Sequence, residues 1–520
     1  MNLSKSNIAS SLVLSSILLS LLNPLATQAM NHHVSMSSGP SKPLSNCVFP
    51  DGTSPKRAEV HCYEPKDFLK AYGIDKLHER GITGKGQVII LADSFGSPTM
   101  QADLDHFSDT FGLPHTKIQF IYPNGTYVND LSDDDKVGWA GETTLDLEWA
   151  HAIAPDATLV NIITNTSETV GLAGFPDLFK GIEMAIQKYP GAIISMSYGT
   201  GEPTFTQSDI TNYLQGSFHK IFEQATSADI TLLASSGDSG NTNIDADQAK
   251  MIPFANAGYP ASDPLVTAVG GTALEYGWKW SPQITADTYW DCKFNPSKNC
   301  TGDIMSSVNT RSRLETVWNE DWAFAAGGGG ISTIFKSPEY QFGLHESIRK
   351  TMNGYRGLPD ISMNAAINGG VEVYSSYAAP GSAQKGPNWQ STGGTSCASP
   401  EMAGIVALAG QKASDELGRT VGVGYLNPIL YSLSSRDFND IVSTRLGFAG
   451  VMIDNNGLYF SENASKKYPT KVPAVAVPGY FTSPGYDLAT GLGSPKALRL
   501  VLDIARVRVE RESKLTMQSN

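Results

Sequence analysis

Short apolar runs rich in β-branched residues recur through the middle of the chain, and amphipathic stretches separate them. The runs that predict strands are QVIILAD (87–93), ATLVNIIT (157–164), AIISMSYG (192–199), ITLLASSGD (230–238) and PLVTAVGGT (264–272). Between them, segments such as LFKGIEMAIQKY place apolar residues at helical spacing. This alternation predicts an α/β fold with a doubly wound, mostly parallel sheet and helices on both of its faces.

Polar residues stand where several of these runs end. They are Asp93 and Ser94, Ser197, Tyr198 and Gly199, and the segment GDSG at 237–240. In an open parallel sheet, binding and catalytic residues gather at the carboxyl ends of the strands. We therefore expect the functional site at this edge.

The two ends of the chain differ from its middle. Residues 1–29 combine Lys5, an apolar run from about Ile8 to Leu22 and small residues near Ala29, which predicts a signal peptide. Serines interrupt this run, so it lacks the roughly 20 unbroken apolar residues of a membrane span. We expect a secreted protein without a membrane anchor. Residues 30–63 form a short polar segment, 64–506 the main domain, and 507–520 a charged, frayed tail.

Composition narrows the function further. With 520 residues, of which 41% are hydrophobic and 17% charged, the chain can bury a large core. A net charge of −13 argues against a nucleic-acid partner. Five cysteines agree with an oxidising destination. Cys47 with Cys62 and Cys292 with Cys300 are the local pairs, other pairings remain open, and Cys397 is left single.

A serine and a pair of carboxylates carry the candidate chemistry. The turn GGTSCASPEMAG (393–404) delivers Ser396 to the start of an apolar helix, like the nucleophile segment of subtilisin-type proteases. No histidine lies in the setting that those enzymes use for the base. In GETTLDLEWAHAIAP (141–155), Glu142 and Asp146 are one helical turn apart on the same side. Such neighbours repel when both are ionised, so one of them keeps a proton; a solvated acidic face is the alternative.

These segments, in their order along the chain, resemble the sedolisin family of serine-carboxyl peptidases, which share the subtilisin fold. Further similar segments are LADSFG, ISMSYG, YPASDPLVTAVGGT, RGLPDIS and PGYDLATGLGSP. The similarity extends from about 64 to 506 and implies a subtilisin-like fold. It also implies that Ser396 is the nucleophile, Glu142 the general base, Asp146 its orienting partner and Asp238 the oxyanion donor.

The two acidic roles set opposite limits on the working pH. Glu142 has to be ionised to accept a proton, whereas Asp238 has to be neutral to donate a hydrogen bond to an oxyanion. Since ordinary carboxyl groups titrate near pH 4, we expect an optimum at roughly pH 3 to 5.

The resemblance also implies substrate-binding and metal-binding residues. Asp93 is expected to assist the acidic pair, while Tyr198, Gly199, Gly328 and Gly329 are expected to line the substrate cleft; strand-end packing is the alternative for these residues. The family's calcium loop predicts one structural Ca²⁺ held by Asp440, Ile441, Ser483, Gly485 and Asp487.

The sequence thus predicts a secreted, monomeric acid endopeptidase that acts on proteins or peptides. Two alternatives remain, namely a tripeptidyl aminopeptidase on the same scaffold and a catalytically silent, calcium-stabilised binding module. Sedolisins are usually made with a long propeptide, for which only 30–63 is available here, so the route of activation stays open.

Overall fold

The computed structural model describes residues 47–50, 57–126, 133–243, 251–277, 313–320, 323, 325–377, 388–447, 452–458 and 477–519. The expected signal peptide, most of the polar segment at 30–63 and the Cys292–Cys300 pair lie outside these ranges. Within them, Cys62 is disulfide-bonded and Cys397 is free and buried.

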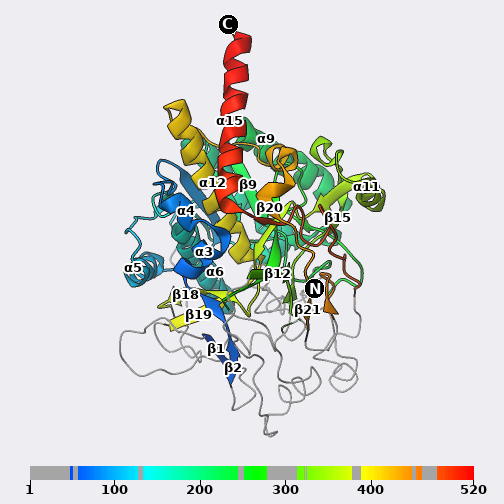
Figure 1. Ribbon diagram of the computed structural model, residues 1–520, viewed down its shortest axis with the longest axis horizontal. Helices are drawn as coiled ribbons and strands as arrows, with labels where there is room; N and C mark the ends of the chain where they lie inside the picture. Colours follow the sequence, from blue (N-terminus) through cyan, green and yellow to red (C-terminus); the bar gives the residue numbers. More distant parts are fainter. Residues whose placement is uncertain are drawn as a thin grey trace, which may run out of the picture.

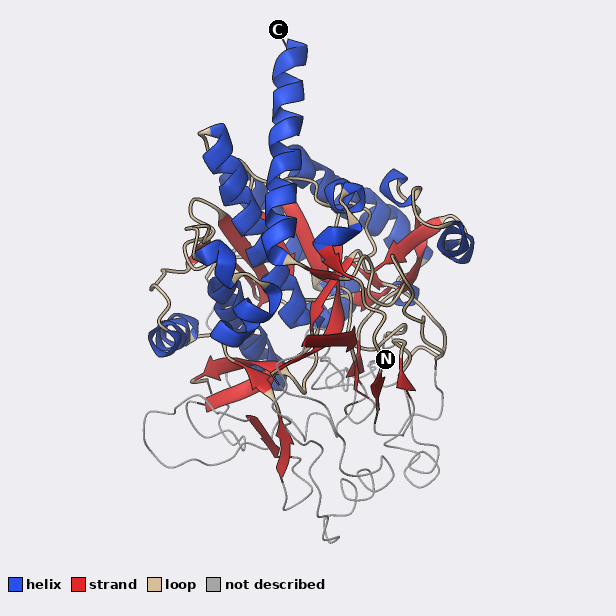
Figure 2. Cartoon of the chain, viewed as in Figure 1, coloured by secondary structure: helices blue, strands red, loops and turns tan. Residues whose placement is uncertain are grey.

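An eight-stranded sheet forms the centre of the molecule (Figure 2). Its order is β12 (Arg313–Val317), β11 (Thr267–Tyr276), β9 (Thr231–Ser235), β7 (Ile193–Met196), β4 (Val88–Ser94), β6 (Thr158–Thr164) and β5 (Gln119–Ile121), and β17 (Ile361–Asn364) also pairs with β11. All pairings are parallel except the antiparallel β11–β12 pair. The expected mostly parallel sheet is confirmed.

Helices cover both faces of this sheet (Figure 1). One face packs against α6 (Asp134–Ile153), α12 (Thr395–Leu417) and α15 (Ala497–Ser519), and the other against α7 (Phe175–Lys188) and α9 (Phe218–Ser227). Along β4, Ile89 and Leu91 enter the first core while Ile90 and Ala92 enter the second. Because both faces are covered, the strands read as continuous apolar runs.

Smaller elements surround the sheet. The additional helices are α3 (Pro65–Tyr72), α4 (Asp75–His78), α5 (Met100–Phe111), α8 (Gln207–Asp209), η3 (Ile210–Ser217), α11 (Glu346–Met352) and α13 (Asn427–Ser432), together with the short 3₁₀ helices η1 (Glu168–Ala173), η2 (Glu202–Thr204), η4 (Glu339–Gln341) and η5 (Ser435–Asp437). The additional strand pairings are β1 (Cys47–Pro50) with β2 (Arg57–Val60), β18 (Gly370–Ser375) with β3 (Cys62–Tyr63) and β19 (Asn388–Thr392), β8 (Thr200–Gly201) with β10 (Gly258–Tyr259), β13 (Asn319–Glu320) with β14 (Ala325–Ala326), β15 (Gly330–Lys336) with β16 (Tyr355–Leu358), β20 (Phe438–Asn439) with β23 (Ser494–Pro495), and β21 (Arg445–Leu446) with β22 (Met452–Ile453).

The end of the chain differs from the expectation of a frayed tail, because α15 continues to Ser519 and projects from the body of the molecule (Figure 1). Charge pairs one turn apart support this extension. Arg506 contacts Glu510 at 2.9 Å and Arg508 contacts Glu512 at 2.6 Å. No helix in the described ranges is long and apolar enough to cross a bilayer.

A close crossing of α6 and α12 sets the geometry of the site. At Gly404 of α12, an added Cβ would lie 2.5 Å from Cβ of Ile153 at the end of α6. Real side chains do not approach this closely, so only glycine allows the two helices to meet here. The crossing holds the start of α12, with Ser396, next to the middle of α6.

Gly404→Ala is therefore expected to destabilise the protein by about 1–3 kcal/mol, the usual cost of overpacking a tight core. The free energy of unfolding from denaturant titration measures this change. Gly141→Ala is the matched control, because it is also helical but nothing lies within 4 Å of its added Cβ. Equal stabilities of the two variants would contradict the close crossing.

Candidate active site

Ser396 lies at the first turn of α12, directly after a glycine turn. Gly394 precedes the helix with φ of 110°, a conformation that favours glycine. The Ser396 side chain is 5% exposed, and its backbone carbonyl accepts a 3.3 Å hydrogen bond from the Ser197 hydroxyl at the end of β7. The nucleophile candidate thus sits at the carboxyl edge of the central strands, where the sequence placed the site.

Glu142, the candidate base, lies next to this serine. Burial raises the pKa of the Glu142 carboxyl well above its usual value, and the hydrogen bond with Ser396 acts in the opposite direction. The negative charges of Asp93 and Asp238 raise this pKa further. The Ser396 side chain therefore lies within reach of the Glu142 carboxyl, although Glu142 Oε1 has no hydrogen-bond partner of standard geometry in the described residues.

Two more acidic side chains lie next to Glu142. The pKa of Asp146 is raised well above its usual value by burial, then by the charges of Glu142 and Asp93. Ser197 offers Asp146 only a weak hydrogen bond, since neither Asp146 oxygen has a partner of standard geometry in the described residues. Asp93 accepts a 2.6 Å hydrogen bond from Asn161, and burial raises the pKa of Asp93 to about 7. The three carboxyl groups thus favour sharing protons over ionising together.

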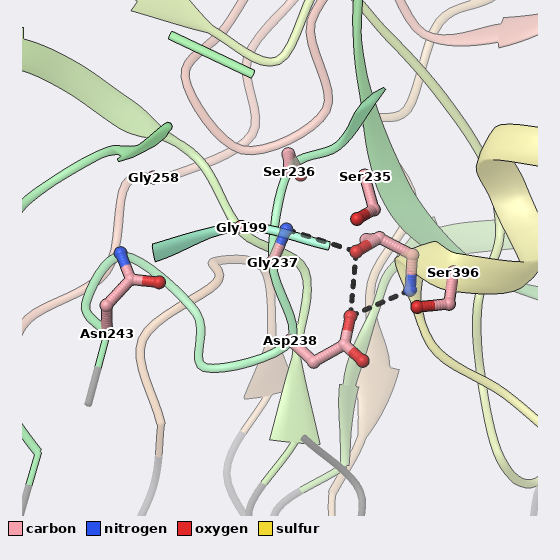
Figure 3. Close-up of a pocket in the computed structure, with 9 residues that line it drawn as sticks. Gly199, Ser235, Ser236, Gly237, Asp238, Asn243, Gly258 and Ser396 are labelled. Carbon is pink, nitrogen blue, oxygen red and sulfur yellow. Dashed lines mark hydrogen bonds between the residues drawn. The ribbon is translucent and has the colours of Figure 1, made fainter. Parts of the chain in front are cut away.

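Asp238 faces Ser396 from the end of β9 (Figure 3). Its Oδ1 accepts hydrogen bonds from the Thr395 amide at 2.7 Å and the Thr395 hydroxyl at 2.8 Å. The Gly237 amide donates to the same hydroxyl at 3.0 Å. Burial raises the pKa of Asp238 to about 6, so the group is neutral in acid. Since Oδ1 is already occupied by two donors, Oδ2 is the oxygen left to carry the proton.

A pocket opens beside these groups. Its lining consists of Gly199, Ser235, Ser236, Gly237, Asp238, Asn243, Gly258, Thr395 and Ser396. Gly199 lines the pocket as expected. Gly328 does not line it, but packs against a lining residue, because its amide donates to the Gly237 carbonyl at 2.6 Å. Gly329 packs against the Leu488 carbonyl, which an added Cβ would approach to 2.2 Å.

The Tyr198 ring does not line the pocket, so the structure favours strand-end packing, the alternative interpretation of this residue. This ring is 1% exposed and packs in the second core, with its centroid 6.0 Å from that of Phe175. Successive side chains point to opposite faces of a strand. Met196 and Tyr198 therefore enter the core under α7, while Ser197 points toward Ser396.

The histidine of α6 contacts a residue outside the pocket. His151 follows Glu142 on α6, but its Nε2 contacts the Pro114 carbonyl at 2.7 Å. Burial lowers the pKa of His151, which therefore favours the neutral form. None of the residues that line the pocket is a histidine.

The structure brings the five expected calcium ligands together. The Gly485 amide donates to Asp440 Oδ2 and the Ser483 amide donates to Asp487 Oδ2, both at 3.0 Å, and Ile441 follows Asp440 directly. Carboxylates from two distant segments thus contact the short loop at 483–487, and Ca²⁺ prefers oxygen ligands of this kind. No group of three or more His, Cys, Asp or Glu side chains suited to a metal occurs in the described residues.

Sequence reasoning missed several residues that shape the site. Thr395 anchors Asp238, and its position next to Ser396 was the available signal. Asn161 holds Asp93, and a lone amide inside the apolar run VNII marked it. Asn243 lines the pocket, although no local pattern singles it out.

The family of the chain follows from comparison with known proteins. Residues 138–421, which include Glu142, Asp238 and Ser396, match the subtilase family of peptidases. Kumamolisin from Bacillus sp. (strain MN-32) is 28% identical over 446 residues, which cover 84% of this chain and 63% of that protein. Sedolisin from Pseudomonas sp. (strain 101) is 26% identical over 415 residues, covering 79% and 55%. The chain belongs to the subtilase family and, within it, to the sedolisins.

The names of other relatives give a different activity, that of a tripeptidyl-peptidase. Tripeptidyl-peptidase sed4 from Aspergillus fumigatus is 26% identical over 433 residues, covering 77% of this chain and 59% of that protein. The chain thus spans about six tenths of the length of the curated relatives it matches. The solved structure of Pseudomonas sedolisin, complexed with two molecules of pseudo-iodotyrostatin, superposes with a TM-score of 0.60 at 23% identity, covering 86% and 99%. This match confirms the subtilisin-like fold.

Proposed function

We propose that the protein is a serine-carboxyl endopeptidase that hydrolyses peptide bonds in acid through an acyl-enzyme on Ser396. The observation that carries this proposal is the position of the buried Glu142 carboxyl beside the Ser396 hydroxyl, close enough for the serine to lower the pKa of that carboxyl. A serine is a weak nucleophile until an adjacent base accepts its proton. The membership of the sedolisin family supports the same assignment.

The reaction begins when ionised Glu142 accepts the proton of the Ser396 hydroxyl and the serine oxygen attacks the substrate carbonyl. The carbonyl oxygen becomes negative and accepts a hydrogen bond from the protonated Asp238 carboxyl. Glu142 then donates its proton to the amine as the C–N bond breaks and the acyl-enzyme forms. Water, deprotonated by Glu142, releases the acid and restores Ser396. Asp146 and Asp93 share the proton and the negative charge with Glu142.

Digestion of a denatured protein at pH 4 to 5, with mass mapping of the products, tests the proposed activity. An endopeptidase releases internal fragments and also cleaves a substrate whose amino terminus is acetylated. Release of successive tripeptides from free amino termini alone would instead establish the tripeptidyl aminopeptidase suggested by the names of some relatives. Complete absence of turnover would instead favour the catalytically silent, calcium-stabilised binding module.

We also propose that one structural Ca²⁺ binds at Asp440, Ile441, Ser483, Gly485 and Asp487. Both carboxylates accept amides of the same loop, and neither forms an ion pair with a basic side chain in the described residues. A bound cation would neutralise this local charge and tie β20 to the loop that precedes β23. Secretion and a monomeric state remain part of the proposal.

Chelation of calcium is accordingly expected to lower the melting temperature. A ligand that binds only the native state at 100 times its Kd contributes about 2.7 kcal/mol, and a chelator removes this contribution. Thermal unfolding with and without excess chelator measures the effect, and Asp440→Asn should reduce it. An unchanged melting temperature, with no calcium found by metal analysis, would contradict the site.

A further inference from the structure

Glu320, the last residue of β13, is a buried carboxyl that the proposed reaction does not use. The residue is 1% exposed and accepts three N–H hydrogen bonds. Its Oε2 accepts the Trp318 indole N–H at 2.9 Å and the Ile367 amide at 2.7 Å, and its Oε1 accepts the Asn368 amide at 2.8 Å. Burial raises the pKa of Glu320, while the charge of Arg445 and the three donors oppose this shift. Both oxygens keep acceptor capacity in either protonation state.

The turn at 365–368, which the Glu320 carboxyl holds through two amides, also supports the segment that leads to the candidate nucleophile. The Ala365 carbonyl accepts the Gly394 amide at 2.7 Å. A Cβ added to Gly393 would lie 2.7 Å from the backbone of the same turn, so the two segments are in close contact. Since the nucleophile follows two residues after Gly394, a shift of this turn would displace it.

The hairpin that carries Glu320 also contacts Asp238. In the pairing of β13 with β14, Glu320 lies opposite Ala325 and Asn319 lies opposite Ala326. The Ala326 amide donates to the Asp238 backbone carbonyl at 2.9 Å. The backbone around Glu320 thus holds the proposed oxyanion donor, while its side chain holds the turn beside the proposed nucleophile.

We propose that Glu320 is a positioning residue that fixes where Ser396 lies relative to Asp238. This inference rests on the proposed peptidase activity. Acyl transfer requires the serine oxygen and the oxyanion donor to meet at one substrate carbonyl, and a misplacement of about 1 Å can cost about 10²-fold in rate. Glu320 acts through the backbones of two segments and does not itself exchange a proton with the substrate.

Glu320→Gln tests this role with almost no change in volume. Glutamine offers one oxygen and one NH₂ group, so at least one of the three N–H donors faces another donor and the turn is displaced. We expect kcat per folded enzyme to fall by about 10- to 100-fold, with KM changed by less than about threefold. Peptide hydrolysis measures both constants, and near-ultraviolet circular dichroism measures the folded fraction. Glu320→Asp, which withdraws both oxygens by one methylene, is the second variant and should lower kcat in the same way.

Two peptides of one sequence, ending in an aldehyde or in the corresponding alcohol, give a readout besides turnover. The aldehyde carbon bonds to the Ser396 oxygen, the serine proton passes through Glu142 to the aldehyde oxygen, and this oxygen faces Asp238; the alcohol binds without a new bond. Glu320→Gln should weaken inhibition by the aldehyde at least about tenfold and inhibition by the alcohol less than about threefold. Glu148→Gln is the matched control, because this buried carboxyl accepts one amide of β18 at 3.0 Å, and it should leave both inhibition constants unchanged.

A folded Glu320→Gln variant that keeps kcat within about threefold of the wild type would overturn the positioning role while the peptidase activity stands. Equal losses of affinity for the aldehyde and the alcohol would overturn it as well. If neither Glu320 variant folds, Glu320 serves general stability and the proposal is also wrong. Cleavage that persists in Ser396→Ala, or no cleavage of any peptide by the wild type, would overturn the proposed function and this inference together.

Discussion

Ser396→Ala is expected to lower kcat by roughly 10⁶-fold while leaving the fold intact. The loss is this large because the hydroxyl is the only atom that forms the acyl bond, and removal of one member of such a catalytic unit disables the whole unit. The fold should persist because alanine favours the helix that begins here. Steady-state hydrolysis of a peptide by the purified variant, together with its melting temperature, measures both effects.

Ser399→Ala is the matched control for this variant. Ser399 lies one turn further along α12, is buried, and pairs with the Ser195 hydroxyl at 2.8 Å outside the pocket. We expect it to retain activity within about tenfold of the wild type. A Ser396→Ala variant with comparable residual activity would contradict the assignment of the nucleophile.

Glu142→Gln is expected to be about as damaging as the loss of the serine, roughly 10⁶-fold in kcat. Glutamine preserves the size of the side chain and can still form a hydrogen bond, but it cannot accept the proton of Ser396. This variant therefore tests proton transfer from Ser396 to Glu142 separately from the packing of the side chain. Single-turnover kinetics should show loss of the acylation step without loss of substrate binding.

Two variants on the same helix separate this role from general damage to α6. Glu148→Gln makes the same change at a buried carboxyl that accepts the Tyr374 amide at 3.0 Å, and should retain most activity. His151→Ala should also be mild, because His151 contacts the Pro114 carbonyl and not Ser396. An inactive His151→Ala variant beside an active Glu142→Gln variant would favour a histidine base.

The central sheet was predictable because both of its faces are buried. Apolar side chains on consecutive residues leave a continuous signal, and the expected run at 87–93 corresponds to β4 (Val88–Ser94). The pair Glu142 and Asp146 was recognisable for a similar reason, since helical spacing brings residues four apart onto one side. The end of α15 was not recognised, because its support comes from charge pairs on an exposed surface and not from an apolar stripe.

Contacts between distant segments account for what sequence reasoning missed. Thr395 anchors Asp238 across 157 positions of the chain, and no local pattern reports such a pair. The direction of the Tyr198 ring depends on which residue of the strand end faces α7, which a polar-looking SYG segment does not reveal. Asn243 acquires its orientation in the pocket through Asn256 and Phe254, which becomes visible only when these residues are placed together.

The acidic groups predict a bell-shaped dependence of activity on pH. The pKa of Asp238 is about 6, so its proton is present below this pH and is lost as the pH rises through it, which removes the oxyanion donor. Burial raises the pKa of Glu142 at every pH, whereas the negative charges of Asp93 and Asp238, which raise it further, are absent in acid. The first proton therefore leaves the carboxyl cluster at a lower pH than the later ones. Activity should therefore fall as the pH drops below this first ionisation. Because burial raises the pKa of Asp238, the alkaline decline should occur at a higher pH than the pKa of an ordinary carboxyl group.

The pH profile of kcat/KM on a peptide without titrating groups tests the carboxyl mechanism most directly. For the wild type we expect a maximum in acid and a decline as the pH rises through about 6. Asp238→Asn retains a hydrogen-bond donor that does not titrate, so its maximum should be lower and its alkaline decline weaker. A wild-type maximum above about pH 7 would contradict catalysis by Glu142 and Asp238.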